Sequence, residues 1–120
     1  MFMNPLNHIA MKKETITISS SQGKKKIHKD KILYCKQYLV GTLIELDDGN
    51  HYLMKEKLEE LAQFLQSDAF FFVSSRELVN LDHLEAVFAD QVLLNNRKTF
   101  KVNPIRKMAL LRKIGKEATL

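Results

Sequence analysis

The stretch FFFVSSRELVNL, residues 70–81, decides the fold of this 120-residue chain. Three phenylalanines and Val73 form an apolar run with polar residues on both sides. The run predicts a short buried β-strand, because it is too short for a helix and is bounded by turn residues. A polar segment follows at residues 74–77, before Leu78 and Val79. The pattern predicts a cationic loop that core residues fix at both ends, an arrangement that often presents side chains to a partner.

Before this stretch, the sequence predicts five short strands joined by turns. Alternating or β-branched residues mark these strands at 15–19, 24–29, 32–35, 42–46 and 51–54. Residues 37–41 are expected to connect two of them. The sequence DDGN at 47–50 predicts a hairpin turn, because Asp-Gly and Gly-Asn steps accept positive φ at little cost.

An amphipathic helix is predicted at residues 55–66. Its apolar residues fall at helical spacing on one face, at Leu58, Leu61, Ala62 and Leu65. The opposite side is acidic, so we expect the apolar stripe to face the core and the helix to lie away from phosphates.

After residues 70–81, the sequence predicts a hairpin, one more strand and a final helix. Residues 78–82 are expected to form a short turn or irregular connection, residues 83–89 and 91–94 a hairpin, and residues 99–102 a strand. Asn103 and Pro104 predict an N-cap and first position of a helix that ends near residue 114, with Gly115 as its stop. The predicted fold class is mainly β, with antiparallel strands in small packed sheets, one mid-chain amphipathic helix and one C-terminal helix.

Length and composition favour a single domain. We predict a leader at residues 1–14, a domain at residues 15–114 and a tail at residues 115–120. The single Cys35 is expected to be a small buried residue of a protein in a reducing cytoplasm. The sequence has no signal-peptide pattern and no apolar run near the roughly 20 residues of a spanning helix. A soluble cytoplasmic protein without membrane insertion is therefore expected.

Basic residues gather toward both ends of the sequence. Residues 12–36 carry a net charge of +6 and residues 97–120 a net charge of +7, whereas residues 37–96 carry −8. Such a distribution favours an anionic partner such as nucleic acid over a neutral metabolite. A solvated basic surface without a partner is the alternative, and charge alone leaves both open.

The sequence offers little support for catalysis. Four histidines are scattered without metal-ligand spacing, and there is no Gly-rich phosphate loop or recognisable nucleophile motif. We expect no enzymatic activity, no cofactor and no metal site.

Four blocks of sequence occur in a recognisable order: DKILY at 30–34, LDDG at 46–49, LEEL at 58–61, and the segment from Phe71 to LVNL at 78–81. Together they resemble the LytTR DNA-binding domain of bacterial transcription regulators over about residues 15–114. The resemblance implies a mostly β protein that binds double-stranded DNA through loops. It also implies two copies bound to promoter repeats, and hence a homodimer on DNA.

The resemblance places three DNA-contacting loops in this chain, at residues 38–41, 74–76 and 103–107. The residues expected to contact DNA are Tyr38, Val40, Gly41, Ser74, Ser75, Arg76, Lys101, Asn103, Arg106 and Lys107. The two arginines suit guanine or phosphate, Ser75 and Asn103 suit phosphate or base edges, and the lysines suit phosphates.

The chain departs from the family pattern in two of these loops. Where the family often has R-x-H-R-S, this sequence has FVSSR at 72–76, and a frequent Ser-Arg pair is replaced by Asn103 and Pro104. The preferred DNA sequence therefore does not transfer from the family.

Several alternatives accompany the DNA-binding hypothesis. Arg76 could instead pair with Glu77 or another acidic residue. Asn80 is expected to tie its turn to the backbone, and the three phenylalanines are expected in the core. The predicted function is a stand-alone transcription regulator, under the control of a regulatory protein partner, of its own abundance, or of a lost domain if the chain is a fragment of a larger regulator. The alternatives are a protein-interaction module that binds a regulatory partner through β-edges, and an RNA-binding protein.

Overall fold

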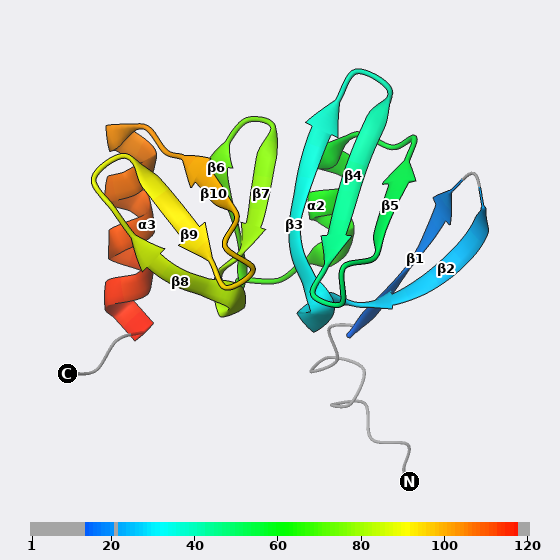
Figure 1. The fold of residues 1–120 in the computed structure, drawn as a ribbon, viewed down its shortest axis with the longest axis horizontal. Coiled ribbons are helices and arrows are strands. Elements are labelled where there is room, and N and C mark those ends of the chain that lie inside the picture. Colours follow the sequence, from blue (N-terminus) through cyan, green and yellow to red (C-terminus); the bar gives the residue numbers. More distant parts are fainter. Residues whose placement is uncertain (1–13, 21, 118–120) are drawn as a thin grey trace, which may run out of the picture.

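Two antiparallel sheets and two α-helices make up the fold in the computed structural model, which describes residues 14–20 and 22–117 (Figure 1). The larger sheet has the strand order β2-β1-β5-β4-β3-β7-β6, and the smaller has the order β10-β9-β8. The mainly β prediction with two helices is confirmed. The predicted leader, apart from Glu14, lies outside the described residues, and the predicted domain boundaries stay a prediction.

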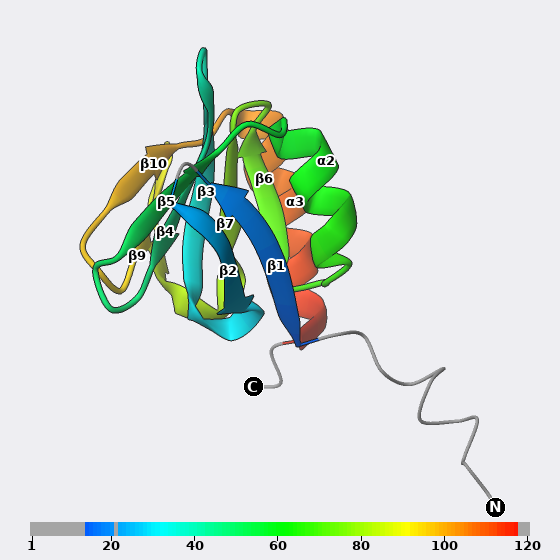
Figure 2. The same ribbon diagram turned by 90° about the vertical axis from the view of Figure 1, so that its right-hand side faces the viewer.

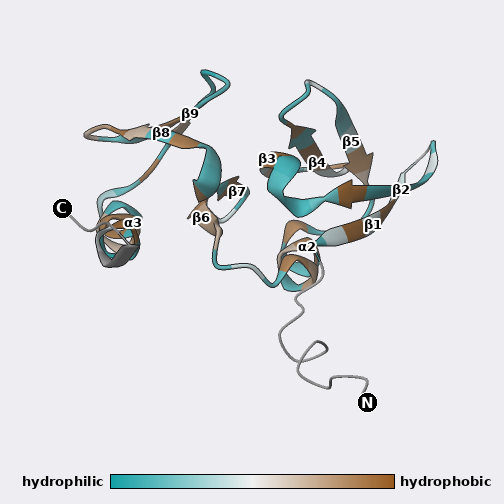
Figure 3. Ribbon diagram, turned by 90° about the horizontal axis from the view of Figure 1, so that it is seen from below, coloured by the Kyte–Doolittle hydropathy of each residue, from teal (hydrophilic) through white to brown (hydrophobic). Residues whose placement is uncertain are grey.

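The larger sheet consists of β1 (Thr15–Ser20), β2 (Gly23–His28), β3 (Ile32–Tyr38), β4 (Gly41–Leu46), β5 (His51–Met54), β6 (Phe70–Ser74) and β7 (Glu77–Asn80). The smaller sheet consists of β8 (Leu84–Val87), β9 (Gln91–Leu94) and β10 (Thr99–Lys101). The helices are α2 (Leu58–Leu65) and α3 (Pro104–Glu117), and 3-10 turns span Lys29–Lys31 and Leu81–His83. Figures 2 and 3 place both helices on the same side of the molecule, and in Figure 3 the connecting turns are mostly hydrophilic.

The strand β6 contributes side chains to two hydrophobic cores. Phe70 and Phe72 pack against the first core, which contains the buried leucines of α2. Phe71 and Val73 belong with the second core, between the smaller sheet, α3 and the β3–β7–β6 end of the larger sheet. Because successive side chains of a strand point to opposite faces, the FFFV run supplies both cores at once. The core role predicted for the phenylalanines is confirmed, although each ring is only half-buried.

The helix α2 uses the predicted apolar face. Leu58, Leu61 and Leu65 are buried in the first core, and Ala62 packs against it. The helix begins at Leu58, later than predicted, and Gln66 ends it in a left-handed conformation (φ 44°). The buried Lys29 donates a hydrogen bond from Nζ to the carbonyl oxygen of Leu65 (2.6 Å), at the C-terminal end of the helix, where a cation is favourable.

The prediction of a short turn or irregular connection at residues 78–82 was wrong for residues 78–80, because the strand β7 covers Glu77–Asn80 and lies between β3 and β6. Residues 81–82 do lie in a turn. Pairing on both sides overrides the weak local signal of a four-residue strand with polar ends. Asn80 is buried, and its Nδ2 donates to the carbonyl of Ile32 (2.8 Å) while its Oδ1 accepts from the backbone N–H of Asp82 (3.0 Å). The predicted role of Asn80 in tying its turn is confirmed.

Several element ends also differ from the prediction. The strand β3 continues to Tyr38, and β4 begins at Gly41, so the predicted connection at residues 37–41 shrinks to a two-residue turn at Leu39 and Val40. The helix α3 continues past Gly115 to Glu117. An exposed glycine in a helix costs only about 1 kcal/mol relative to alanine, which does not by itself end the helix.

Candidate nucleic-acid interface

The three predicted loops lie at the same end of the molecule. Figure 1 shows the β3–β4 turn, the β6–β7 turn and the start of α3 along its upper edge. The β9–β10 turn lies at the opposite end. Loops that are distant in sequence therefore form one surface, which we call the loop surface.

The β3–β4 hairpin and the β6–β7 turn are bound directly to each other. The backbone N–H of Gln37 donates to the carbonyl oxygen of Arg76 (2.8 Å). On the neighbouring pair of residues, Lys36 forms a salt bridge with Glu77 (Nζ to Oε2, 3.5 Å). The two loops are thus held in a fixed relation by main-chain bonding between adjacent strands.

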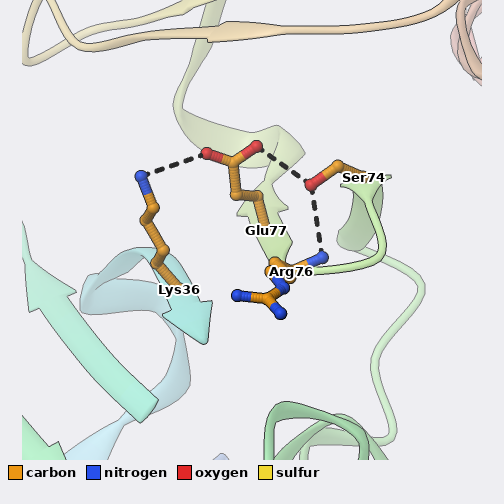
Figure 4. Close-up of polar contacts among 4 residues, drawn as sticks. All are labelled: Lys36, Ser74, Arg76 and Glu77. Carbon is orange, nitrogen blue, oxygen red and sulfur yellow. Dashed lines mark hydrogen bonds and ion pairs between the residues drawn. The ribbon is translucent and has the colours of Figure 1, made fainter. Parts of the chain in front are cut away.

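The β6–β7 turn is stabilised by Ser74 and leaves Arg76 exposed. The Ser74 hydroxyl donates to Glu77 Oε1 (2.9 Å) and accepts from the backbone N–H of Arg76 (3.2 Å). Figure 4 shows the Glu77 carboxylate between Lys36 and Ser74, while the Arg76 guanidinium points away from it. Within residues 14–20 and 22–117, no ion pair engages Arg76, so the alternative of an Arg76–Glu77 pair was wrong.

Gln37 ties the β3–β4 hairpin to the first turn of α2. Its Oε1 accepts from the backbone N–H of Leu58 (2.6 Å), one of the N-terminal donors that a helix cannot satisfy internally. Its Nε2 donates to the carbonyl of Tyr38 (2.9 Å). A groove of about 350 Å³ lies between the hairpin, the β6–β7 turn and α2, and Arg76 and Lys57 are among its lining residues.

The tip of the β3–β4 hairpin is apolar and exposed. Leu39 and Val40 are 97% and 74% exposed, and Tyr38 is 43% exposed with the Lys36 ammonium 5.5 Å from its ring centroid. Gly41 differs, because it is buried with φ +148° and an added Cβ would collide with the carbonyl oxygen of Met54. Gly41 therefore has a packing role, and its predicted DNA contact is limited to its backbone.

Asn103 caps the helix α3 as predicted. Its Oδ1 accepts from the backbone N–H of Arg106 (2.8 Å). Arg106 donates from Nη1 to the carbonyl of Phe72 (3.0 Å), which joins α3 to β6. Lys107 donates to the carbonyl of Ala89 (3.0 Å), in the β8–β9 turn. Lys101 is exposed at the end of β10.

The predicted site residues therefore fall into two groups. The exposed ones are Tyr38, Val40, Ser75, Arg76, Lys101 and Asn103, of which Asn103 also caps α3. The others, Gly41, Ser74, Arg106 and Lys107, are buried or half-buried and take part in contacts that hold the loops. Sequence reasoning missed the exposed Leu39 and the positioning role of Gln37. Leu39 could have been found from the sequence, since a bulky apolar pair is unusual in a two-residue hairpin turn. Gln37 could not, because it acts through a contact with a residue 21 positions away in sequence.

Burial raises the pKa of two ionisable core residues, Cys35 and Tyr34. Cys35 is a buried residue of the first core, as predicted, and this burial raises the pKa of its thiol far above the usual value. Burial, and then the charge of Glu45, raises the pKa of Tyr34. Across residues 14–20 and 22–117, His, Cys, Asp and Glu form no group of three that could bind a metal ion. No helix in that described part is long and apolar enough to cross a membrane.

Comparison with known proteins gives one family and one fold. The model of the family described as LytTr DNA-binding domain matches residues 22–115. No curated protein matches the chain. A similar solved structure is the LytTr DNA-binding domain of a putative methyl-accepting/DNA response regulator from Bacillus cereus. It has a TM-score of 0.74 and 18% sequence identity, over 87% of this chain and 99% of that chain, and at this identity it supports the fold alone.

Proposed function

Because this chain belongs to the LytTr DNA-binding domain family, we propose that it is a transcription regulator of the cytoplasm that binds specific sequences of duplex DNA with its loop surface. The loops enter neighbouring grooves, and two copies occupy a promoter repeat. The observation that carries this proposal is the gathering of the β3–β4 turn, the β6–β7 turn and the start of α3 at one end (Figure 1). That the chain acts as a stand-alone regulator stays a prediction.

Arg76 is the central contact in this proposal. Its guanidinium is exposed, and the neighbouring carboxylate of Glu77 is already engaged by Lys36 and Ser74. An arginine without an acidic partner can donate two hydrogen bonds to guanine O6 and N7, or bind phosphate. The backbone bond from Gln37 to Arg76 holds this turn in place before DNA arrives, which lowers the entropic cost of binding.

The remaining predicted contacts have different roles. Ser75 is exposed beside Arg76 and suits a phosphate or base edge, and Lys101 suits a phosphate. Arg106 uses one of its five N–H donors for the carbonyl of Phe72, and the remaining donors are able to bind DNA. Asn103 accepts with its side-chain oxygen at the helix cap, which leaves its amide group as a donor.

Loss of the Arg76 charge should weaken binding to DNA. The probe is a duplex that the protein itself selects from a randomised library, and affinity is measured by fluorescence anisotropy. We expect Arg76→Gln to lower affinity about tenfold, the equivalent of one good base contact, and to relax the preference at one base pair.

Arg97→Gln is the matched control. Arg97 is exposed, pairs with Glu85 (2.7 Å) and lies in the β9–β10 turn at the opposite end of the molecule. The Arg97→Gln substitution removes the same charge as Arg76→Gln, and we expect it to change the affinity for DNA less than about twofold. Equal losses in the two variants, or no duplex selected by the wild-type protein, would contradict the proposal.

A protein-interaction module is the second candidate, and one observation favours it. The strand β1 pairs with β5 only at Ser20 and Met54, and the rest of β1 borders a groove of about 540 Å³. Glu56 lines this groove, and its Oε1 is buried without a hydrogen-bond partner in the described part of the chain. An added strand could pair there. Absence of duplex binding, with partner binding that survives Arg76→Ala and Arg106→Ala, would favour this candidate.

A further inference from the structure

The turn at Leu39 and Val40 breaks the usual chemistry of a two-residue hairpin. Such turns favour Asn, Asp and Gly, the residue types that also make up the longer turn at the other end of β4, DDGN at residues 47–50. Leu39 and Val40 have neither the polarity nor the conformational freedom of those residues. Positions that break a local rule without a packing reason are often functional.

Packing does not explain this apolar pair. Leu39 is 97% exposed and Val40 is 74% exposed, so neither side chain adds to a core. Figure 2 shows the β3–β4 tip projecting beyond the rest of the loop surface. Burial of a leucine or valine side chain is worth about 1.5–3 kcal/mol, which the folded chain leaves unused.

The surroundings of the tip favour a nucleic-acid partner over an apolar one. Lys57 and Arg76 line the groove next to Leu39 together with one acidic residue, Glu59, and Lys36 lies under the Tyr38 ring. Cations around an apolar projection match a duplex, in which phosphates flank the bases. The apolar group exposed on the major-groove edge of DNA is the C5 methyl of thymine.

We propose that Leu39 and Val40 are specificity-determining residues that contact thymine methyl groups in the major groove. The inference rests on the proposed DNA binding and adds a chemical preference to it. The hairpin is bonded to the β6–β7 turn through Gln37 and Arg76. The thymines therefore lie next to the base or phosphate that Arg76 contacts.

Replacement of thymine by uracil tests the inference, because it removes only the methyl group. In the selected duplex, each thymine is replaced singly by deoxyuridine, and affinity is measured by anisotropy. We expect one or two replacements to lower wild-type affinity about fourfold, which corresponds to the loss of one buried methyl-sized group. Replacement of the other thymines should leave affinity unchanged.

The double variant Leu39→Ala/Val40→Ala should bind the thymine and uracil duplexes equally well. Phe64→Ala is the control, since Phe64 is 67% exposed but lies in the last turn of α2. This variant should keep the thymine preference. Thermal melting of each variant establishes that the exposed substitutions leave the fold intact.

Three outcomes separate the inference from the proposed function. Tight binding by the wild-type protein without any loss on uracil replacement would overturn the inference alone. The inference would also be overturned if the double variant lost affinity by the same factor on both duplexes, relative to the wild-type protein, and so kept the thymine preference. That result would indicate a wedge between bases or a sugar contact. Failure of the wild-type protein to select any duplex would overturn the proposed function itself.

Discussion

Gly41 shows that a residue in a binding loop can be required by the fold. Its φ of +148° is rarely adopted by other residues, and the carbonyl of Met54 occupies the place of a Cβ. Gly49 in the β4–β5 turn also has positive φ (+90°), but nothing lies within 4 Å of its missing Cβ. A comparison of substitutions at the two glycines therefore separates the cost of an unfavourable φ from the cost of a steric collision.

Gly41→Ala should destabilise the protein more than Gly49→Ala. We expect a loss of about 1 kcal/mol in the free energy of unfolding for Gly49→Ala, from the conformation alone. Gly41→Ala should cost about 2–4 kcal/mol, because the collision adds to that strain. Urea denaturation measures both, and equal losses would show that Met54 moves aside freely.

At the scale of elements, the sequence correctly predicted the helices and turns that depend on residues close together in the chain. The DDGN turn and the spacing of leucines in α2 depend on neighbouring residues, and both were predicted correctly. The strand β7 was missed because its pairing with β3 and β6 joins residues far apart in sequence. For the same reason, the sequence named Arg76 but not Gln37, which fixes the Arg76 turn through a bond across strands.

The start of α3 combines a structural and a predicted functional role in Asn103. Asn103→Ala should lower the free energy of unfolding by about 1 kcal/mol, because the N-cap hydrogen bond to the Arg106 N–H is lost. Asn103→Ser and Asn103→Asp should keep stability, since both side chains can cap. Urea denaturation measures this effect.

The same substitutions of Asn103 also test whether the start of α3 contacts DNA. Asn103→Asp places a carboxylate on the loop surface, so we expect weaker duplex binding despite normal stability. Asn103→Ser adds no charge and should bind nearly as well as the wild-type protein. Unchanged affinity of Asn103→Asp would place the start of α3 away from the phosphates.

At the scale of the whole molecule, the loop surface should give a salt-dependent affinity. The cations among the predicted DNA contacts are Arg76, Arg106 and Lys107 in the loops and Lys101 at the end of β10. If each contacts a phosphate, log K should fall with log salt with a slope of roughly −4 per copy, since each contact adds about 0.9. Anisotropy titrations between about 50 and 200 mM salt measure this slope.

Lys101→Gln should reduce the magnitude of that slope by about one without changing the preferred sequence, as expected for a phosphate contact. Arg97→Gln is again the control, because the β9–β10 turn lies at the opposite end of the molecule. A slope near zero for the wild-type protein would exclude phosphate binding as the basis of affinity.

The alternation of β6 between the two cores limits how the sequence of this protein can change. Substitution of one phenylalanine by another apolar residue alters a single contact region. Insertion or deletion of one residue would exchange the positions of Phe71 and Val73 with those of Phe70 and Phe72, and so would misplace side chains in both cores. Homologous sequences should therefore vary in side-chain size along this strand but keep its length.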